Sequence, residues 1–163
     1  MGRYRPPAPK KSPYITREGY LGMQAEQEAL WKKRREVVKH LAAAAAEGDR
    51  SENAEYIYRK KQLREMDRRI RYLETRIPKL KVVDNTPDDL DRIFFGATVT
   101  LENDDGEELT YRIVGADEFD PAKNWISVDS PMAKALIKRS LDDEITVSLP
   151  GGEATFVVLE VSY

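Results

Sequence analysis

The chain has 163 residues, of which 40% are hydrophobic and 34% are charged. Its length allows one or two compact domains, and because no apolar run is long enough to span a bilayer, we expect no membrane partner. The absence of cysteine excludes disulfides and thiolate metal sites, and it fits a reducing, cytoplasmic location.

The formal net charge of −2 conceals a division between the two halves of the chain. Residues 1–83 carry 21 Lys and Arg against 11 Asp and Glu, a net charge of +10, whereas residues 84–163 carry 6 against 18, a net charge of −12. This asymmetry predicts two domains with different partners. The basic half suits a polyanion such as nucleic acid.

The first 13 residues are basic and rich in proline, and they lack the apolar segment of a secretory signal. We therefore expect residues 1–13 to form a flexible basic tail, to which we assign no function.

Residues 16–46 predict a first long helix whose seam positions are separated by three and four residues, as in a coiled coil. Gly19 and Gly22 weaken the beginning of this helix, so we expect its start nearer Met23. The seam positions are Tyr20, Met23, Gln27, Leu30, Arg34, Val37, Leu41 and Ala44.

Residues 51–77 predict a second helix with the same spacing. Pro78 lacks a backbone donor and disfavours helix at Ile77, so the helix should end there. A short connection leaves antiparallel pairing as the practical arrangement, in a rod roughly 40 Å long. The seam positions are Tyr56, Arg59, Leu63, Met66, Ile70, Leu73 and Ile77.

The turn between the helices, residues 47–56, is polar and acidic. Gly48 can adopt the positive φ that often closes a helix, and Asp49 or Ser51 can cap the next one. Asp49 and Glu52 have the spacing of a capping box, but two exposed carboxylates can also bind a hard cation such as Mg²⁺. Two carboxylates are too few to hold Mg²⁺ tightly, so metal binding would require ligands from another protein.

The outward positions of the second helix are strongly basic, since residues 59–81 hold ten Lys and Arg against three Asp and Glu. One interpretation is a solvated helix face with a few intrahelical ion pairs. The surplus of positive charge favours instead a surface that follows the phosphates of a nucleic acid.

After a linker signature in residues 84–92, the periodicity changes from helical to alternating. Residues 97–101 and 109–114 predict a hairpin with Asp105 and Gly106 in its turn. The remaining predicted elements are a strand at 125–128, a short helix at 131–138 capped by Ser130 with Pro131 at its first position, and a second hairpin at 144–149 and 154–161.

The predicted fold class is therefore α+β, with an N-terminal antiparallel two-helix coiled coil followed by a small antiparallel α+β domain. The predicted divisions are the tail at 1–13, the coiled-coil hairpin at 14–83, the linker at 84–92 and the small domain at 93–163.

The usual catalytic arrangements are missing from the sequence. The single histidine, His40, falls in the middle of a predicted helix, and neither a Gly-rich phosphate loop nor a nucleophile–base pair is legible. We predict that the chain is not itself an enzyme, and we expect a monomer.

Two stretches are distinctive: Gly-Asp-Arg-Ser-Glu-Asn-Ala-Glu-Tyr at residues 48–56 and Leu-Arg-Glu-Met-Asp-Arg-Arg at residues 63–69. Together they resemble the bacterial Gre transcript-cleavage factors. The basic second helix and the Arg-Ser pair within the turn make the chain more similar to the GreB type than to the GreA type. The resemblance covers roughly residues 13–163, and it is extended by residues 94–97, 111–115 and 126–133.

The resemblance implies a transcription elongation factor whose coiled coil enters the secondary channel of RNA polymerase. Asp49 and Glu52 would then help to hold a catalytic Mg²⁺ jointly with the polymerase, and the chain would have no cofactor of its own. Backtracked RNA would be cut endonucleolytically, and elongation would resume. The residues expected to contact the 3′ end of the nascent RNA are Lys60, Lys61, Arg64 and Arg68.

The resemblance also implies that the small domain is FKBP-like and docks on the polymerase through Asp129, Ser130 and Pro131. The alternative for these three residues is a simple helix cap, which is compatible with docking.

Three alternatives to cleavage stimulation stay open at this stage. The first is an RNA-binding or scaffolding module whose turn carboxylates only cap a helix. The second is a regulator that occupies the same channel without promoting cleavage, which the Asp-x-x-Glu spacing at Asp49 and Glu52 disfavours. The third is an FKBP-type prolyl isomerase, for which we expect no activity.

Overall fold

The structure is a computed structural model that describes residues 4–48 and 53–163. Its residues pack into two units: Glu18–Leu80 form a helical unit, and the chain up to Arg17 joins Lys81–Tyr163 in a second unit, the small domain. By packing, the segment before the first helix therefore goes with the small domain. None of the helices in the described ranges combines the length and apolar character that a membrane crossing requires.

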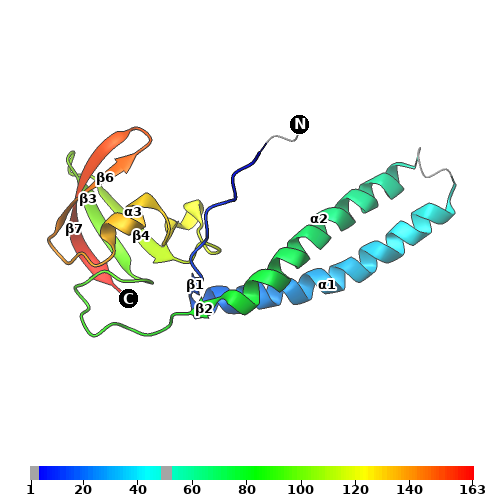
Figure 1. Cartoon of the computed structure of the whole chain (residues 1–163), viewed down its shortest axis with the longest axis horizontal. Coiled ribbons are helices and arrows are strands. Elements are labelled where there is room, and N and C mark those ends of the chain that lie inside the picture. The colour runs from blue at the N-terminus through cyan, green and yellow to red at the C-terminus, as the bar shows by residue number, and fades with distance from the viewer. Residues whose placement is uncertain (1–3, 49–52) are drawn as a thin grey trace. The chain divides into compact units, whose positions relative to one another are not determined.

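The helical unit consists of two long antiparallel helices, α1 (Arg17–Ala46) and α2 (Ala54–Arg76), which lie side by side (Figure 1). A 3₁₀ turn, η1 (Ile77–Lys79), follows α2 and contains Pro78. None of the predicted seam positions is exposed, which confirms the coiled-coil seam. The seam residues that are buried are Met23, Val37, Ala44, Met66, Ile70, Leu73 and Ile77.

The first helix begins at Arg17, six residues before Met23, so the later start expected from Gly19 and Gly22 is wrong. The reason is tertiary. The residue before the helix, Thr16, is buried, and its backbone N–H donates to the Glu118 carboxylate at 3.1 Å. The Thr16 hydroxyl donates to the same carboxylate. This anchoring outweighs the helix cost of roughly 1 kcal/mol for each glycine.

The small domain is a curled five-stranded sheet with one short helix, α3 (Pro131–Leu136), packed against it (Figure 1). Alternate residues of the sheet face a single core, to which α3 contributes Met132, Ala133 and Leu136. The strands, in spatial order, are β5 (Trp125–Ser127), β4 (Glu108–Val114), β3 (Thr98–Asn103), β7 (Gly152–Ser162) and β6 (Glu144–Leu149).

Both predicted hairpins form, but the sheet is mixed and not purely antiparallel. In the first hairpin Gly106 has a φ of +78°, and the Asn103 side chain accepts the N–H groups of Asp105 and Glu107. The strand that departs from the predicted antiparallel arrangement is β5, which runs parallel to β4. The ten residues between these strands include a 3₁₀ turn, η2 (Pro121–Lys123), and are long enough to return the chain to the same end of the sheet.

The segment before α1 is built into the small domain. Its strand β1 (Tyr14–Ile15) pairs in parallel with β2 (Lys81–Val82), and the Ile15 side chain is fully buried. Gly115 lies against this strand, where an added Cβ would be only 2.2 Å from the Tyr14 carbonyl oxygen. Glycine is therefore required at this position for the strand to lie as close as it does.

Candidate functional site

The two carboxylates predicted at the turn, Asp49 and Glu52, lie outside the described residues. The residues that flank them are described on both sides. Gly48, which follows α1, has a φ of +138°, a conformation that side chains disfavour. Asn53 stands at the beginning of α2.

Asn53 is the cap of α2, so the prediction that Asp49 or Ser51 caps this helix is wrong. The Asn53 side-chain oxygen accepts the N–H of Tyr56 at 3.1 Å, and its amide nitrogen donates to the Ala44 carbonyl of α1 at 2.7 Å. One side chain thus caps the second helix and ties it to the end of the first. Asparagine caps a helix as well as aspartate or serine does. The sequence signal that could have identified this cap is the presence of Asn53 directly before Ala54, the first residue of the helix.

We predict that Asn53→Ala lowers the free energy of unfolding of the helical unit by about 1–2 kcal/mol, since it removes both the cap and the link to Ala44. Asn53→Asp retains a cap acceptor but loses the donor to Ala44, so it should cost about half as much. Urea unfolding followed by circular dichroism at 222 nm measures both changes, with Asn85→Ala in the exposed linker as the control. Equal losses for the Ala and Asp variants would contradict a capping role.

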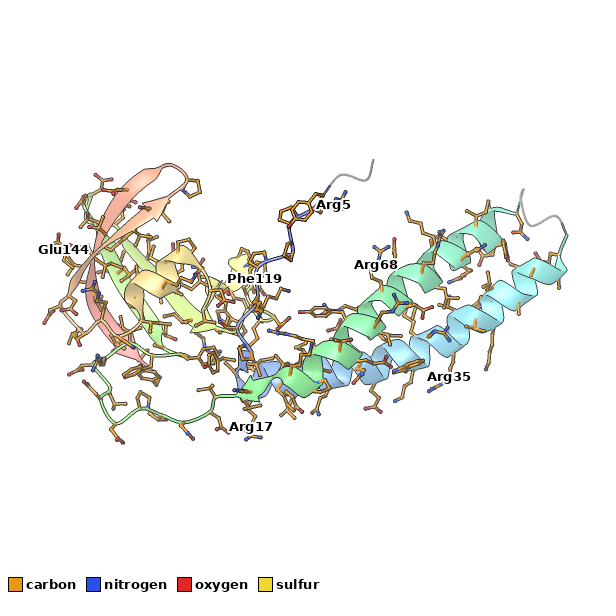
Figure 2. The ribbon with its side chains drawn as sticks, in the orientation of Figure 1. Arg5, Arg17, Arg35, Arg68, Phe119 and Glu144 are labelled. Atoms are coloured by element: carbon orange, nitrogen blue, oxygen red, sulfur yellow. The ribbon has the colours of Figure 1, made fainter. Side chains whose placement is uncertain are left out.

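The four basic residues predicted to contact RNA, Lys60, Lys61, Arg64 and Arg68, are all exposed on α2, and we call them the basic face. Figure 2 shows Arg68 projecting from α2 on the side away from α1. Long cationic side chains on a solvated helix face can follow successive phosphates of a nucleic acid strand.

Other arginines of the helical unit are engaged in ion pairs that join the two helices. The Arg69 guanidinium donates hydrogen bonds to both carboxylate oxygens of Glu26, at 2.7 and 3.0 Å. The Arg34 Nε lies 2.7 Å from the Asp67 carboxylate. The hydrogen bond from Asp67 raises the pKa of Arg34 above its usual value. These pairs hold the helices in register, with gains of up to roughly 1 kcal/mol each.

The three predicted docking residues lie together in a tight turn, residues 129–131, which we call the docking loop. The Ser130 hydroxyl accepts the Ala133 N–H at 3.2 Å, which confirms Ser130 as the cap of α3, and Pro131 is the first residue of that helix. The Asp129 N–H donates to the Ser127 hydroxyl at 3.1 Å. These contacts fix the backbone of the loop.

The Asp129 carboxylate has a hydrogen-bond partner that no local sequence pattern predicts. The Ser12 N–H donates to it at 2.8 Å, and the Ser12 hydroxyl donates to its other oxygen. The two residues are 117 positions apart in the chain, so only the fold brings them together.

A pocket of about 420 Å³ opens beside the docking loop and has mainly apolar and aromatic walls. The Trp125 ring in one wall is covered by the Arg112 guanidinium at 4.9 Å and by the Lys123 ammonium at 4.7 Å. The other main lining residues are Tyr111, Phe119, Pro121, Ile126 and Ser130.

No group of three or more His, Cys, Asp or Glu side chains placed to hold a metal ion occurs within residues 4–48 and 53–163. The candidate functional features in the described part of the chain are the basic face, the docking loop and the pocket beside it.

Two family models match the chain and together span almost all of it. Transcription elongation factor, N-terminal (GreA_GreB_N) matches residues 13–82, and Transcription elongation factor, GreA/GreB, C-term matches residues 87–163.

Curated relatives match over nearly their full length. The chain is 58% identical over 165 residues to transcription elongation factor GreB of Xanthomonas axonopodis pv. citri (strain 306), covering 100% of this chain and 98% of that protein. It is 55% identical over 154 residues to GreB of Yersinia pestis, covering 94% and 90%. It is 52% identical over 164 residues to GreB of Pseudomonas aeruginosa, covering 100% and 98%.

Solved structures of similar proteins match this chain with TM-scores below 0.5. GreA factor homolog 1 (Gfh1) of Thermus thermophilus gives a TM-score of 0.42 at 23% identity, covering 92% of this chain and 98% of that chain. The transcription elongation factor GreA/GreB from Nitrosomonas europaea gives 0.43 at 26% identity, covering 55% and 76%.

Proposed function

Since this chain belongs to the GreA/GreB family of RNA polymerase-associated transcription elongation factors, we propose that it stimulates the polymerase to cleave backtracked nascent RNA. In this proposal the antiparallel hairpin of α1 and α2 enters the secondary channel of the polymerase. By the helical rise of ~1.5 Å per residue, α1 is roughly 45 Å long, and such a long, narrow element supports the proposal that the hairpin reaches a buried centre.

The observation that carries the proposal is the division of tasks at the turn. Asn53 caps α2 and ties it to α1, so the helix has its cap without Asp49 and Glu52. Because Asn53 provides the cap of α2, we propose that the Asp49 and Glu52 carboxylates serve a task outside the chain. This assignment removes the main support for the alternative in which the two residues only cap the helix.

Asp49 and Glu52 would serve as oxygen ligands, the kind that Mg²⁺ prefers. Because two carboxylates are too few for tight binding, the polymerase would provide the remaining ligands and the ion would be shared. When bound, the shared Mg²⁺ would supply an activated water and neutralise charge on the phosphate. The water oxygen would form a bond to phosphorus as the bond between phosphorus and the 3′ oxygen breaks, leaving a 3′ hydroxyl from which elongation resumes and a 5′ phosphate on the released fragment.

The basic face would hold the extruded RNA. Its four side chains, Lys60, Lys61, Arg64 and Arg68, begin within two turns of the helix start and extend along α2. Such contacts are made to phosphates and carry no base information, so the proposal predicts action on RNA of any sequence.

The docking loop would bind the polymerase surface. Its backbone is fixed by the Ser130 cap and by the hydrogen bond from Asp129 to Ser127, so the loop can bind with little loss of conformational entropy.

The test is a cleavage assay on stalled, backtracked elongation complexes with labelled RNA. We expect that adding this protein releases short 3′ fragments and restores elongation when nucleotides are supplied. Polymerase binding without fragment release would instead favour a regulator that occupies the channel, and RNA binding without polymerase binding would favour a scaffolding module.

A further inference from the structure

The N-terminal segment lies against the docking loop, and residues 8–13 are here called the strap. Besides the two hydrogen bonds from Ser12 to Asp129, the Lys11 ammonium lies 3.9 Å from the Asp117 carboxylate. The strap continues directly into β1, which is fixed by its pairing with β2 and by the close approach of Tyr14 to Gly115. The position of Ser12 is therefore restrained by the strand β1 that follows it in the chain.

The grip of Ser12 engages both oxygens of the Asp129 carboxylate. The backbone N–H and the hydroxyl come from one residue, so the carboxylate cannot rotate without losing a charge-assisted hydrogen bond. The Asp129 N–H is meanwhile bound to Ser127. The backbone of Asp129 is thus fixed by its hydrogen bond to Ser127 of the sheet, and its carboxylate is fixed by the hydrogen bonds from Ser12 of the strap.

The strap lies on the same face of the small domain as the apolar pocket beside the docking loop. A cleft of about 560 Å³ lies between the strap, at Ala8, Pro9 and Lys10, and the domain, at Phe119 and Lys134. Phe119, labelled in Figure 2, is 59% exposed and also lines the apolar pocket beside the docking loop. The strap, Phe119 and the docking loop are therefore contiguous.

We propose that the strap is an integral part of the polymerase-docking face, and that Ser12 is the positioning residue that orients Asp129 within it. This inference rests on the proposed docking role of residues 129–131. It gives a function to a segment for which sequence predicts only a flexible tail, and it assigns Asp129 a role that depends on Ser12.

The experiment measures the dissociation constant of the full-length chain for RNA polymerase. Ser12→Ala should weaken binding roughly tenfold, the effect of losing a hydrogen bond to a charged group. Ser12→Thr, which retains both donors, should restore it. Ser148→Ala, at an exposed position of β6, is the matched control and should leave binding unchanged.

A double-mutant cycle separates positioning from a direct contact. Asp129→Asn should weaken binding to a similar degree, and the Ser12→Ala, Asp129→Asn double variant should be no weaker than either single variant, because the two residues act as one unit. In Ser12→Ala, amide hydrogen exchange at residues 127–133 should be faster, while exchange in β6 and β7 is unchanged.

Two results would overturn parts of this scheme, and they differ. If Asp129→Asn weakens binding and Ser12→Ala does not, the strap is not part of the docking face, while the docking role of the loop stands. If Asp129→Asn itself leaves binding unchanged, the proposed docking role of the loop fails, and the positioning role of Ser12 fails with it.

Discussion

Replacing Asp49 by Ser should lower the rate of transcript cleavage in stalled polymerase complexes by about 100-fold or more, a loss comparable to removal of one preorganised group in other active sites. Glu52→Gln should have a similar effect, because it exchanges a charged oxygen ligand for a neutral amide. Binding to the polymerase should change little, since the docking loop and the basic face are untouched. The measurement is the rate of release of 3′ RNA fragments at saturating factor.

The matched control for these variants is Glu47→Gln. Glu47 is an exposed carboxylate at the end of α1, two residues before Asp49, so the substitution removes the same charge from nearly the same place. It should cleave at close to the normal rate. Equal losses in Glu47→Gln and Asp49→Ser would show that only the net negative charge of the turn matters. Normal cleavage by both Asp49→Ser and Glu52→Gln would refute the ligand role.

Replacing all four residues of the basic face with Ala should weaken action on long extruded RNA roughly 10- to 100-fold at moderate salt. Each lost phosphate contact on a single strand lowers the slope of log affinity against log salt by ~0.7, so the slope should fall by about 3. Short extruded RNA, which does not reach the face, should be cleaved almost normally. The measurement is the cleavage rate as a function of RNA length and salt concentration.

The control for the basic face removes four positive charges from the other helix. Lys32, Lys33, Arg35 and Lys39 are exposed residues of α1, among which Figure 2 labels Arg35. Their replacement by Ala changes the total charge by the same amount. If both quadruple variants lose the same activity and salt dependence, long-range attraction explains the effect and local contacts do not.

Much of the fold could be predicted because its signals are local. The three–four spacing that runs from Tyr20 to Ala44 and from Tyr56 to Ile77 identifies a helical seam regardless of what surrounds it. The cap at Ser130 and the Asp105-Gly106 turn are likewise encoded within a few residues. The direction of β5 is not, because a three-residue strand looks the same whichever way it runs.

The candidate site divides in the same way. The basic face is continuous along one helix, so charge and spacing were enough to find it. The start of α1 and the partner of Asp129 depend on Thr16 meeting Glu118 and on Ser12 meeting Asp129, contacts across more than a hundred residues of sequence. No local pattern encodes such a contact, and without an account of the fold the segment before α1 resembles any other proline-rich tail.

The parallel pairing of β1 with β2 joins the two strands of the small domain that precede and follow the helical unit in the chain, with Tyr14 opposite Lys81 and Ile15 opposite Val82. In terms of chain order, the helical hairpin is an insertion into the small domain, which acts as its host because it contains the chain on both sides of the hairpin. Such an insertion can be lengthened, shortened or exchanged between relatives while the host keeps its core and its strand pairing. The helical unit and the small domain can therefore change independently of each other, both in evolution and in engineered variants.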